Sequence, residues 1–125
     1  MRTRVVTFLL LLGTAAAPLA ADARADAKKQ VEFGIAVAQR GLWREAIYRW
    51  ERAVQIDPKY AEALNDLAIA YEHEGDLEKA RVAYEKALEI EPNNALIKQN
   101  YELFKEINDR TTRKETPDDQ GNQTP

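Results

Sequence analysis

Residues 61–94 read AEALNDLAIAYEHEGDLEKARVAYEKALEIEPNN. Small and apolar side chains recur at helical spacing on both sides of a breaker at Gly75-Asp76, and Pro92 closes the block. The first apolar series is Leu64, Leu67, Ala68 and Tyr71, and the second is Leu77, Ala80, Tyr84, Ala87, Leu88 and Ile90. This spacing predicts two amphipathic helices joined by a tight turn rather than a pair of strands.

A copy of this block lies immediately upstream, in residues 27–60. The positions that match between the copies are Gly41 with Gly75, Ala46 with Ala80, Trp50 with Tyr84, Ala53 with Ala87, Ile56 with Ile90 and Pro58 with Pro92. Small residues let two helices approach closely, and a proline ends the helix before it. The repeat therefore predicts stacked helical hairpins. We expect helices over about residues 27–40, 43–56, 61–74, 77–89 and 95–110.

This pattern resembles the tetratricopeptide repeat family. The second copy carries that family's eight positions almost completely, as Leu64, Leu67, Ala68, Tyr71, Ala80, Tyr84, Ala87 and Pro92. The first copy departs from the pattern at Gln30 and Val37. The resemblance implies an all-α, short superhelix of two helix-turn-helix repeats, residues 27–60 and 61–94, within a domain over residues 27–110.

A third block begins after the second repeat and is incomplete. It keeps Asn100-Tyr101, but Glu102 replaces a small residue and Lys105 replaces an aromatic one. No second helix follows, so we interpret residues 95–110 as a capping helix with a polar outer face. Residues 111–125 contain no large apolar side chain and are predicted to form a disordered tail.

The N-terminus has the layout of a secretory signal peptide over residues 1–21. Arg2 and Arg4 precede an apolar run over residues 5–12, and an alanine-rich stretch follows. The run is far shorter than the roughly 20 residues that span a bilayer. We expect an exported protein, periplasmic or secreted, although an uncleaved leader that tethers the chain to a membrane is the alternative.

Composition excludes several classes of function. The formal net charge is −3, and removing residues 1–21 takes away two arginines and no acid. An acidic chain without a basic stripe is a poor nucleic-acid binder, because phosphate neutralisation supplies most of that affinity. The absence of cysteine excludes disulfides and thiolate chemistry, and no phosphate-binding or nucleophile motif is present. The sequence therefore predicts no enzyme, no cofactor and no metal site. A metal site is not expected because His73 is the single histidine, and the chain has no cysteine that could bind a metal with it.

The resemblance implies that partners bind on the concave face, which the first helix of each repeat lines. The residues expected to contact a protein or peptide partner there are Val31, Ile35, Gln39, Glu62, Asn65, Ile69, Glu72, His73 and Leu103. Apolar side chains rimmed by acids favour a short peptide or helix with apolar anchors and some positive charge. The clamp for C-terminal carboxylates is rejected, because Val31 and Ile35 stand where that subgroup needs lysine and asparagine.

The predicted function is therefore a non-catalytic interaction module in a cell-envelope complex. The alternative from another class is a self-assembling structural module. Self-association as a homo-oligomer is a hypothesis, motivated by the apolar Val31, Ile35 and Val37 on the leading helix.

Overall fold

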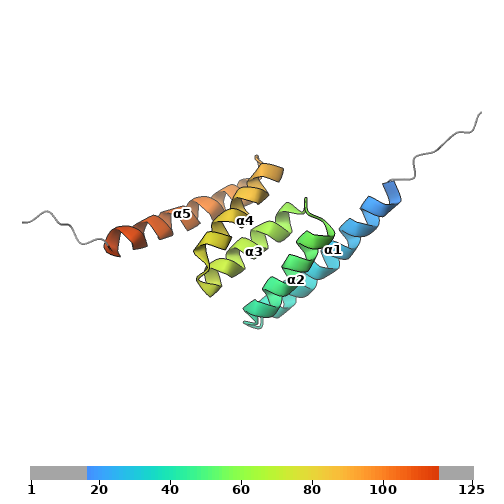
Figure 1. Ribbon diagram of the computed structural model, residues 1–125, viewed down its shortest axis with the longest axis horizontal. Helices are drawn as coiled ribbons and strands as arrows, with labels where there is room; N and C mark the ends of the chain where they lie inside the picture. Colours follow the sequence, from blue (N-terminus) through green and yellow to red (C-terminus); the bar gives the residue numbers. More distant parts are fainter. Residues whose placement is uncertain (1–16, 116–125) are drawn as a thin grey trace, which may run out of the picture.

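The computed structural model describes residues 17–115, and within that range every element is a helix. The helices are α1 (Ala17–Ala38), α2 (Trp43–Ile56), α3 (Ala61–Glu74), α4 (Leu77–Ile90) and α5 (Ala95–Glu115). The hairpins α1–α2 and α3–α4 stack side by side, and α5 closes the array at the end opposite α1 (Figure 1). The predicted all-α superhelix of two hairpins and a closing helix is confirmed.

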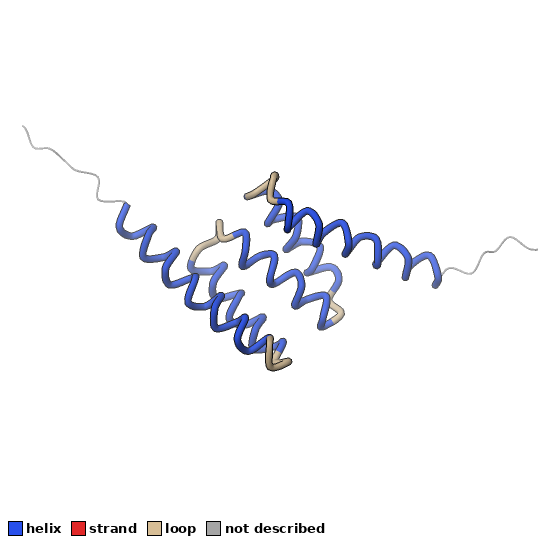
Figure 2. Tube along the Cα trace, turned by 180° about the vertical axis from the view of Figure 1, so that it is seen from behind, coloured by secondary structure: helices blue, strands red, loops and turns tan. Residues whose placement is uncertain are grey.

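The helices α1, α3 and α5 follow one another across the molecule in roughly the same direction, and short turns connect α1 to α2 and α3 to α4 (Figure 2). Helices α2 and α3 have the predicted bounds, and α4 ends one residue later than expected. The outer two helices are longer than predicted. Their extra turns are the main difference between the sequence-based expectation and the structure.

Helix α1 begins ten residues before the expected start at Ala27. The intervening residues hold no internal breaker, and Pro18 lies in the first turn, where a missing N–H has no helical partner to lose. Arg24 holds this extension to the loop between α2 and α3: its guanidinium pairs with Asp57 and lies 4.4 Å from the centroid of the Tyr60 ring.

The C-terminal helix also continues beyond its expected end. Helix α5 includes residues 111–115, which were assigned to the tail. Residues 116–125 of the predicted tail and residues 1–16 of the predicted signal peptide lie outside the described range, so both assignments stay predictions.

A single glycine ends the first helix of each hairpin. Gly41 and Gly75 both have φ of 77°, in the left-handed region that favours glycine. The next residue then donates back into the helix: Leu42 N–H to the Val37 carbonyl at 3.1 Å and Asp76 N–H to the Tyr71 carbonyl at 2.8 Å. The breakers read from the sequence are thus the chain reversals of the structure.

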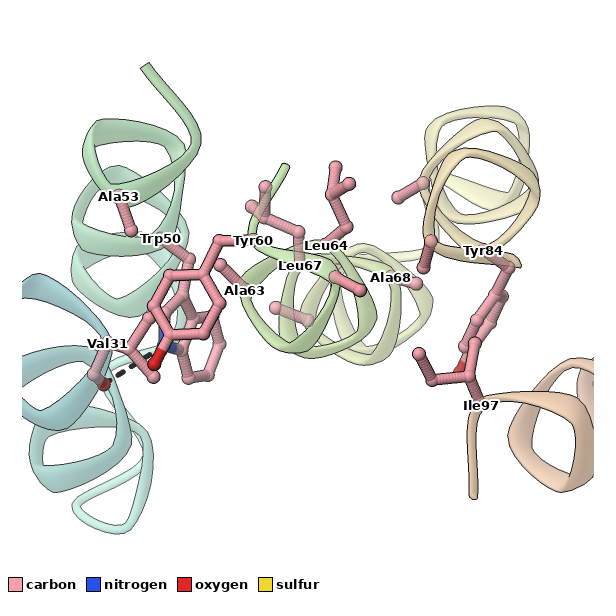
Figure 3. Close-up of a cluster of buried hydrophobic side chains, with 14 of the residues drawn as sticks. Val31, Trp50, Ala53, Tyr60, Ala63, Leu64, Leu67, Ala68, Tyr84 and Ile97 are labelled. Atoms are coloured by element: carbon pink, nitrogen blue, oxygen red, sulfur yellow. Dashed lines mark hydrogen bonds between the residues drawn. The ribbon is translucent and has the colours of Figure 1, made fainter. Parts of the chain in front are cut away.

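Small residues form the contacts where helices cross. Ala46, Ala53, Ala68, Ala80 and Ala87 are all completely buried, as the repeat pattern predicted. Larger side chains fill the space between hairpins, and Tyr84, Ile97 and Val31 are the largest that are fully buried (Figure 3). The core is therefore a thin layer that runs the length of the array.

Each helix after α1 sends an aromatic donor to the helix before it. Trp50 Nε1 donates to the Val31 carbonyl at 3.2 Å (Figure 3), Tyr71 to Glu51 at 2.7 Å, Tyr84 to Glu72 at 2.5 Å and Tyr101 to Glu85 at 2.8 Å. Each aromatic body buries apolar surface while its polar end finds an acceptor. These four bonds join all neighbouring helices of the array.

We predict that Gly34→Ala destabilises the fold by about 2 kcal/mol, although alanine is the better helix former by about 1 kcal/mol. A Cβ at residue 34 lies 2.7 Å from Trp50 Cε2 and 2.8 Å from its Cδ1, inside van der Waals contact. The indole has little room to yield, because its Nε1 is bonded to the Val31 carbonyl. Urea denaturation of the purified variant measures the loss.

A double-mutant cycle with Trp50→Phe identifies the cause of that loss. The smaller phenylalanine ring relieves the clash. The double variant should therefore lose less unfolding free energy than the sum of the losses measured for Gly34→Ala and Trp50→Phe alone. Strict additivity would contradict the steric explanation. Gly75→Ala is the matched comparison: it meets nothing within 4 Å, so only its backbone strain acts, and Trp50→Phe should not offset it.

Candidate partner-binding groove

A cavity of about 360 Å³ lies between α1 and α3. Its lining residues are Ile35, Ala38, Gln39, Trp43, Trp50, Asp66 and Ile69. Ile35, Gln39 and Ile69 were predicted from sequence as partner-binding residues, and the structure brings these three together. We name this space the α1–α3 cavity.

A second cavity, of about 390 Å³, lies between α3 and the start of α5. Its lining residues are Arg24, Tyr60, Glu62, Asn65, Asp66, Glu91, Asn94, Leu96 and Ile97. It therefore contains the predicted residues Glu62 and Asn65, in a more polar setting than the first cavity. We name it the α3–α5 cavity, and the groove is the surface that contains both cavities.

Three aliphatic residues recur one repeat apart along the groove helices. Ile35 on α1, Ile69 on α3 and Leu103 on α5 occupy the same position of successive repeats. Ile35 is 38% exposed and Leu103 is 55% exposed, while Ile69 is partly buried. We call these three residues the aliphatic ladder, which offers apolar surface on each of α1, α3 and α5.

Two predicted contact residues belong to the core rather than to the surface. Val31 is 1% exposed, and its carbonyl accepts the Trp50 hydrogen bond, so its side chain is not open to a partner. Asn65 is 5% exposed, and its Oδ1 accepts from Asn100 Nδ2 at 3.0 Å. Burial of Val31 and Val37 also removes two of the three residues that motivated self-association.

Two further predicted residues are engaged in contacts within the array. Glu72 accepts from the Tyr84 hydroxyl, which fixes it against α4. His73 stacks on Trp43 with ring centroids 3.9 Å apart, and so joins the two hairpins. Within residues 17–115 no three acidic, histidine or cysteine side chains come together as a metal site. The other predicted acid on α3, Glu62, is exposed and lines the α3–α5 cavity, where the Tyr60 side chain is its hydrogen-bond partner.

Asp66 is the groove residue that sequence reasoning missed. It lines both cavities, and its Oδ2 is buried without a hydrogen-bond partner. The pKa of its carboxyl is raised to about 7: burial is the main cause, the negative charge of Glu62 also raises it, and a hydrogen bond from the Asn65 side chain partly offsets both. The signal was available in the spacing, since Glu62, Asp66 and Ile69 share one helix face.

A larger cavity, of about 520 Å³, lies on the opposite side of α3, between α2 and α4. Its floor includes the core residues Leu64 and Leu67, and Val82 stands at its edge with 41% exposure. Tyr71 on its wall is already bonded to Glu51. This α2–α4 cavity lacks the buried, unpaired polar atom that marks the groove.

Paired helices stacked in register define a short helical-repeat protein. A model described as a tetratricopeptide repeat matches residues 61–94, and a model described as a TPR repeat matches residues 34–75. Residues 34–94 therefore consist of tetratricopeptide repeats, a type of repeat that typically forms a protein–protein interaction module. Repeats of this type are typically non-catalytic.

Several curated proteins share this similarity. The uncharacterized protein ycf37 of Pyropia yezoensis is 49% identical over 45 residues, which make up 36% of this chain and 25% of that protein. Cellulose synthase operon protein C of Escherichia coli strain K12 is 34% identical over 93 residues, or 68% of this chain and 8% of that protein. The type IV pilus assembly protein PilF of Pseudomonas aeruginosa is 32% identical over 89 residues, or 70% of this chain and 35% of that protein.

These matches span only a quarter, 8% and 35% of the three relatives, so the similarity concerns the repeats and not their whole architecture. In the described part of the chain, no helix has the length and hydropathy needed to cross a membrane.

We predict that Asp66 makes the fold less stable as pH rises. In the unfolded chain its carboxyl loses its proton near the ordinary value of 3.8, whereas the folded protein retains it to about 7. Between these values the folded state binds the extra proton, so the free energy of unfolding falls with rising pH and levels off above 7. The full difference is on the order of 4 kcal/mol.

Asp66→Asn removes this titration, and thermal unfolding at pH values below 4 and above 7 measures the effect. The variant should match the wild type at low pH, where Asp66 is neutral in both states, and exceed its stability at high pH. Glu89→Gln, on the exposed face of α4, is the control. An Asp66→Asn effect of equal size at both pH values would contradict the assignment.

Proposed function

We propose that this protein is a non-catalytic module that holds a peptide or helix of a protein partner in the groove. The aliphatic ladder carries this proposal, because it places an apolar side chain that is exposed or only partly buried at the same position of α1, α3 and α5. Exposed apolar groups gathered on one face mark an interaction surface more often than scattered ones do.

The two cavities give such a partner places to anchor. The α1–α3 cavity lies between Ile35 and Ile69, so an apolar side chain of the partner that enters it contacts the ladder on two helices. Burying one such side chain contributes about 1.5–3 kcal/mol. Glu62 lines the neighbouring cavity and forms no ion pair within the described residues, which favours a partner with positive charge.

We further propose that the protein works outside the cytoplasm, in a cell-envelope complex. The basic and apolar pattern of residues 1–21 supports export. Two of the similar proteins are named for type IV pilus assembly and for a cellulose synthase operon, which fits a partner in such an assembly. The mass of the N-terminal peptide of the protein purified from its own cells tests the leader: an intact Met1 would favour the tethered alternative.

We predict that Ile69→Glu weakens partner binding at least tenfold. A display library of random linear peptides is selected on the wild-type protein, and the affinity of the selected peptide is measured by calorimetry. A charge at residue 69 removes apolar contact and adds a desolvation cost, each about 1 kcal/mol or more. Leu103→Glu, at a more exposed ladder position, repeats the test where the fold is less affected.

Val82→Glu is the matched control, because it makes the same change at the α2–α4 cavity. Circular dichroism first establishes that each variant keeps its helices. Loss of binding in Val82→Glu alone would move the site to the other side of α3. Binding that survives both ladder changes would contradict the groove proposal.

A further inference from the structure

We propose that Asp66 determines which partners the groove accepts, by receiving a lysine or arginine side chain that follows an apolar anchor. This inference rests on the proposed function, since it assumes that the groove holds a peptide. It adds the chemistry of the occupant, an apolar and basic segment, and assigns the selectivity to one residue.

The position of Asp66 is the first support. Among the described residues it alone lines both the α1–α3 and the α3–α5 cavity, so it stands at the wall between them. A segment that crosses from α1 to α5 over α3 therefore passes this carboxyl. Ile69 lies one turn further along the same helix face, in reach of the aliphatic stem of a basic side chain.

The hydrogen bonding of Asp66 is the second support. Asn100 on α5 donates to Asn65, and the Asn65 side chain bonds the Asp66 carboxyl, so this chain fixes the residue from one side. Its Oδ2 is left buried and unpaired. A buried acceptor without a donor is costly, and an ammonium or guanidinium group is the strongest donor that a peptide can supply.

The surrounding charge is the third support. Glu62 precedes Asp66 by one turn, and Glu91 lines the same cavity from the turn after α4. The cation that lines it is Arg24 of α1, which is already paired with Asp57. The α1–α3 cavity contributes no charged side chain other than Asp66 itself. The local field is therefore negative and favours a cation over a neutral or acidic side chain.

Binding of a cation should be coupled to loss of the Asp66 proton. The carboxyl is neutral below about pH 7 and attracts a cation only when ionised. Affinity for a basic peptide should then rise with pH through this value, and the bound cation should lower the pKa of Asp66. Neither effect is expected of a carboxylate that only supports the fold.

The first experiment uses n-butylammonium, the lysine side-chain analogue, on the full-length protein. The carboxyl ¹³C resonance of Asp66 is titrated by NMR with and without the probe, and n-butanol is the uncharged control. We expect n-butylammonium to lower the pKa of Asp66 and n-butanol to leave it unchanged. An Asp66 titration that n-butylammonium does not move would overturn the inference.

The second experiment selects the random-peptide library on wild type and on Asp66→Asn, whose neutral side chain is close in shape. The wild type should enrich lysine or arginine beside an aliphatic residue, and its binding should tighten from pH about 6 to about 8. Asp66→Asn should lose the basic preference, the pH dependence and about tenfold of the affinity. Glu89→Gln, on the exposed face of α4 and outside the groove, should keep all three.

The outcomes separate the two proposals. Peptides that bind the groove without a basic residue would overturn the role of Asp66 and leave the groove function standing. A wild-type protein that selects no groove-binding peptide would overturn the proposed function, and the inference with it.

Discussion

The array depends on the aromatic donors that join each helix to the one before it. Trp50 shows the principle: its ring fills the space against Gly34, and its Nε1 is fixed on the Val31 carbonyl. Apolar packing alone permits small slides between helices, whereas a directional bond at the end of a rigid ring allows far less. Because Tyr71, Tyr84 and Tyr101 repeat this arrangement along the chain, the relative positions of α1, α3 and α5 follow from it.

The same bonds decide which polar groups remain for a partner. Glu72 is a groove residue by its place in the repeat, but the Tyr84 hydroxyl occupies its carboxylate. Val31 is likewise committed, since its side chain lies in the core beside the ring that its carbonyl holds. The side chains available to a partner are therefore those that these bonds between helices do not use. They are the aliphatic ladder and the acids Glu62 and Asp66.

Repetition made most of the fold predictable. Gly75 and Pro92 have counterparts one repeat earlier, so two independent copies placed the same turns and helix ends. The first and last helices each have only one neighbouring hairpin, and the bounds predicted for them from the repeat were too short. Helix α1 extends back to Ala17, and α5 continues to Glu115. For the site, spacing predicted that Ile35 and Ile69 lie near each other, and both line the α1–α3 cavity. It did not predict the burial of Asn65, because that depends on Asn100, 35 residues away, through a hydrogen bond that no local pattern encodes.

Asp66 is difficult to explain by stability alone. Short repeat arrays depend on a few interfaces between neighbours, and small domains are stable by only about 5–15 kcal/mol. A carboxyl with a buried, unpaired oxygen is a large loss on that scale, and an asparagine has nearly the same shape without the charge. The apolar residues that flank it are packed as a fold requires, so the carboxylate itself is the exception. Local penalties of this kind concentrate where a protein binds or reacts, because the missing partner atom is supplied by the ligand.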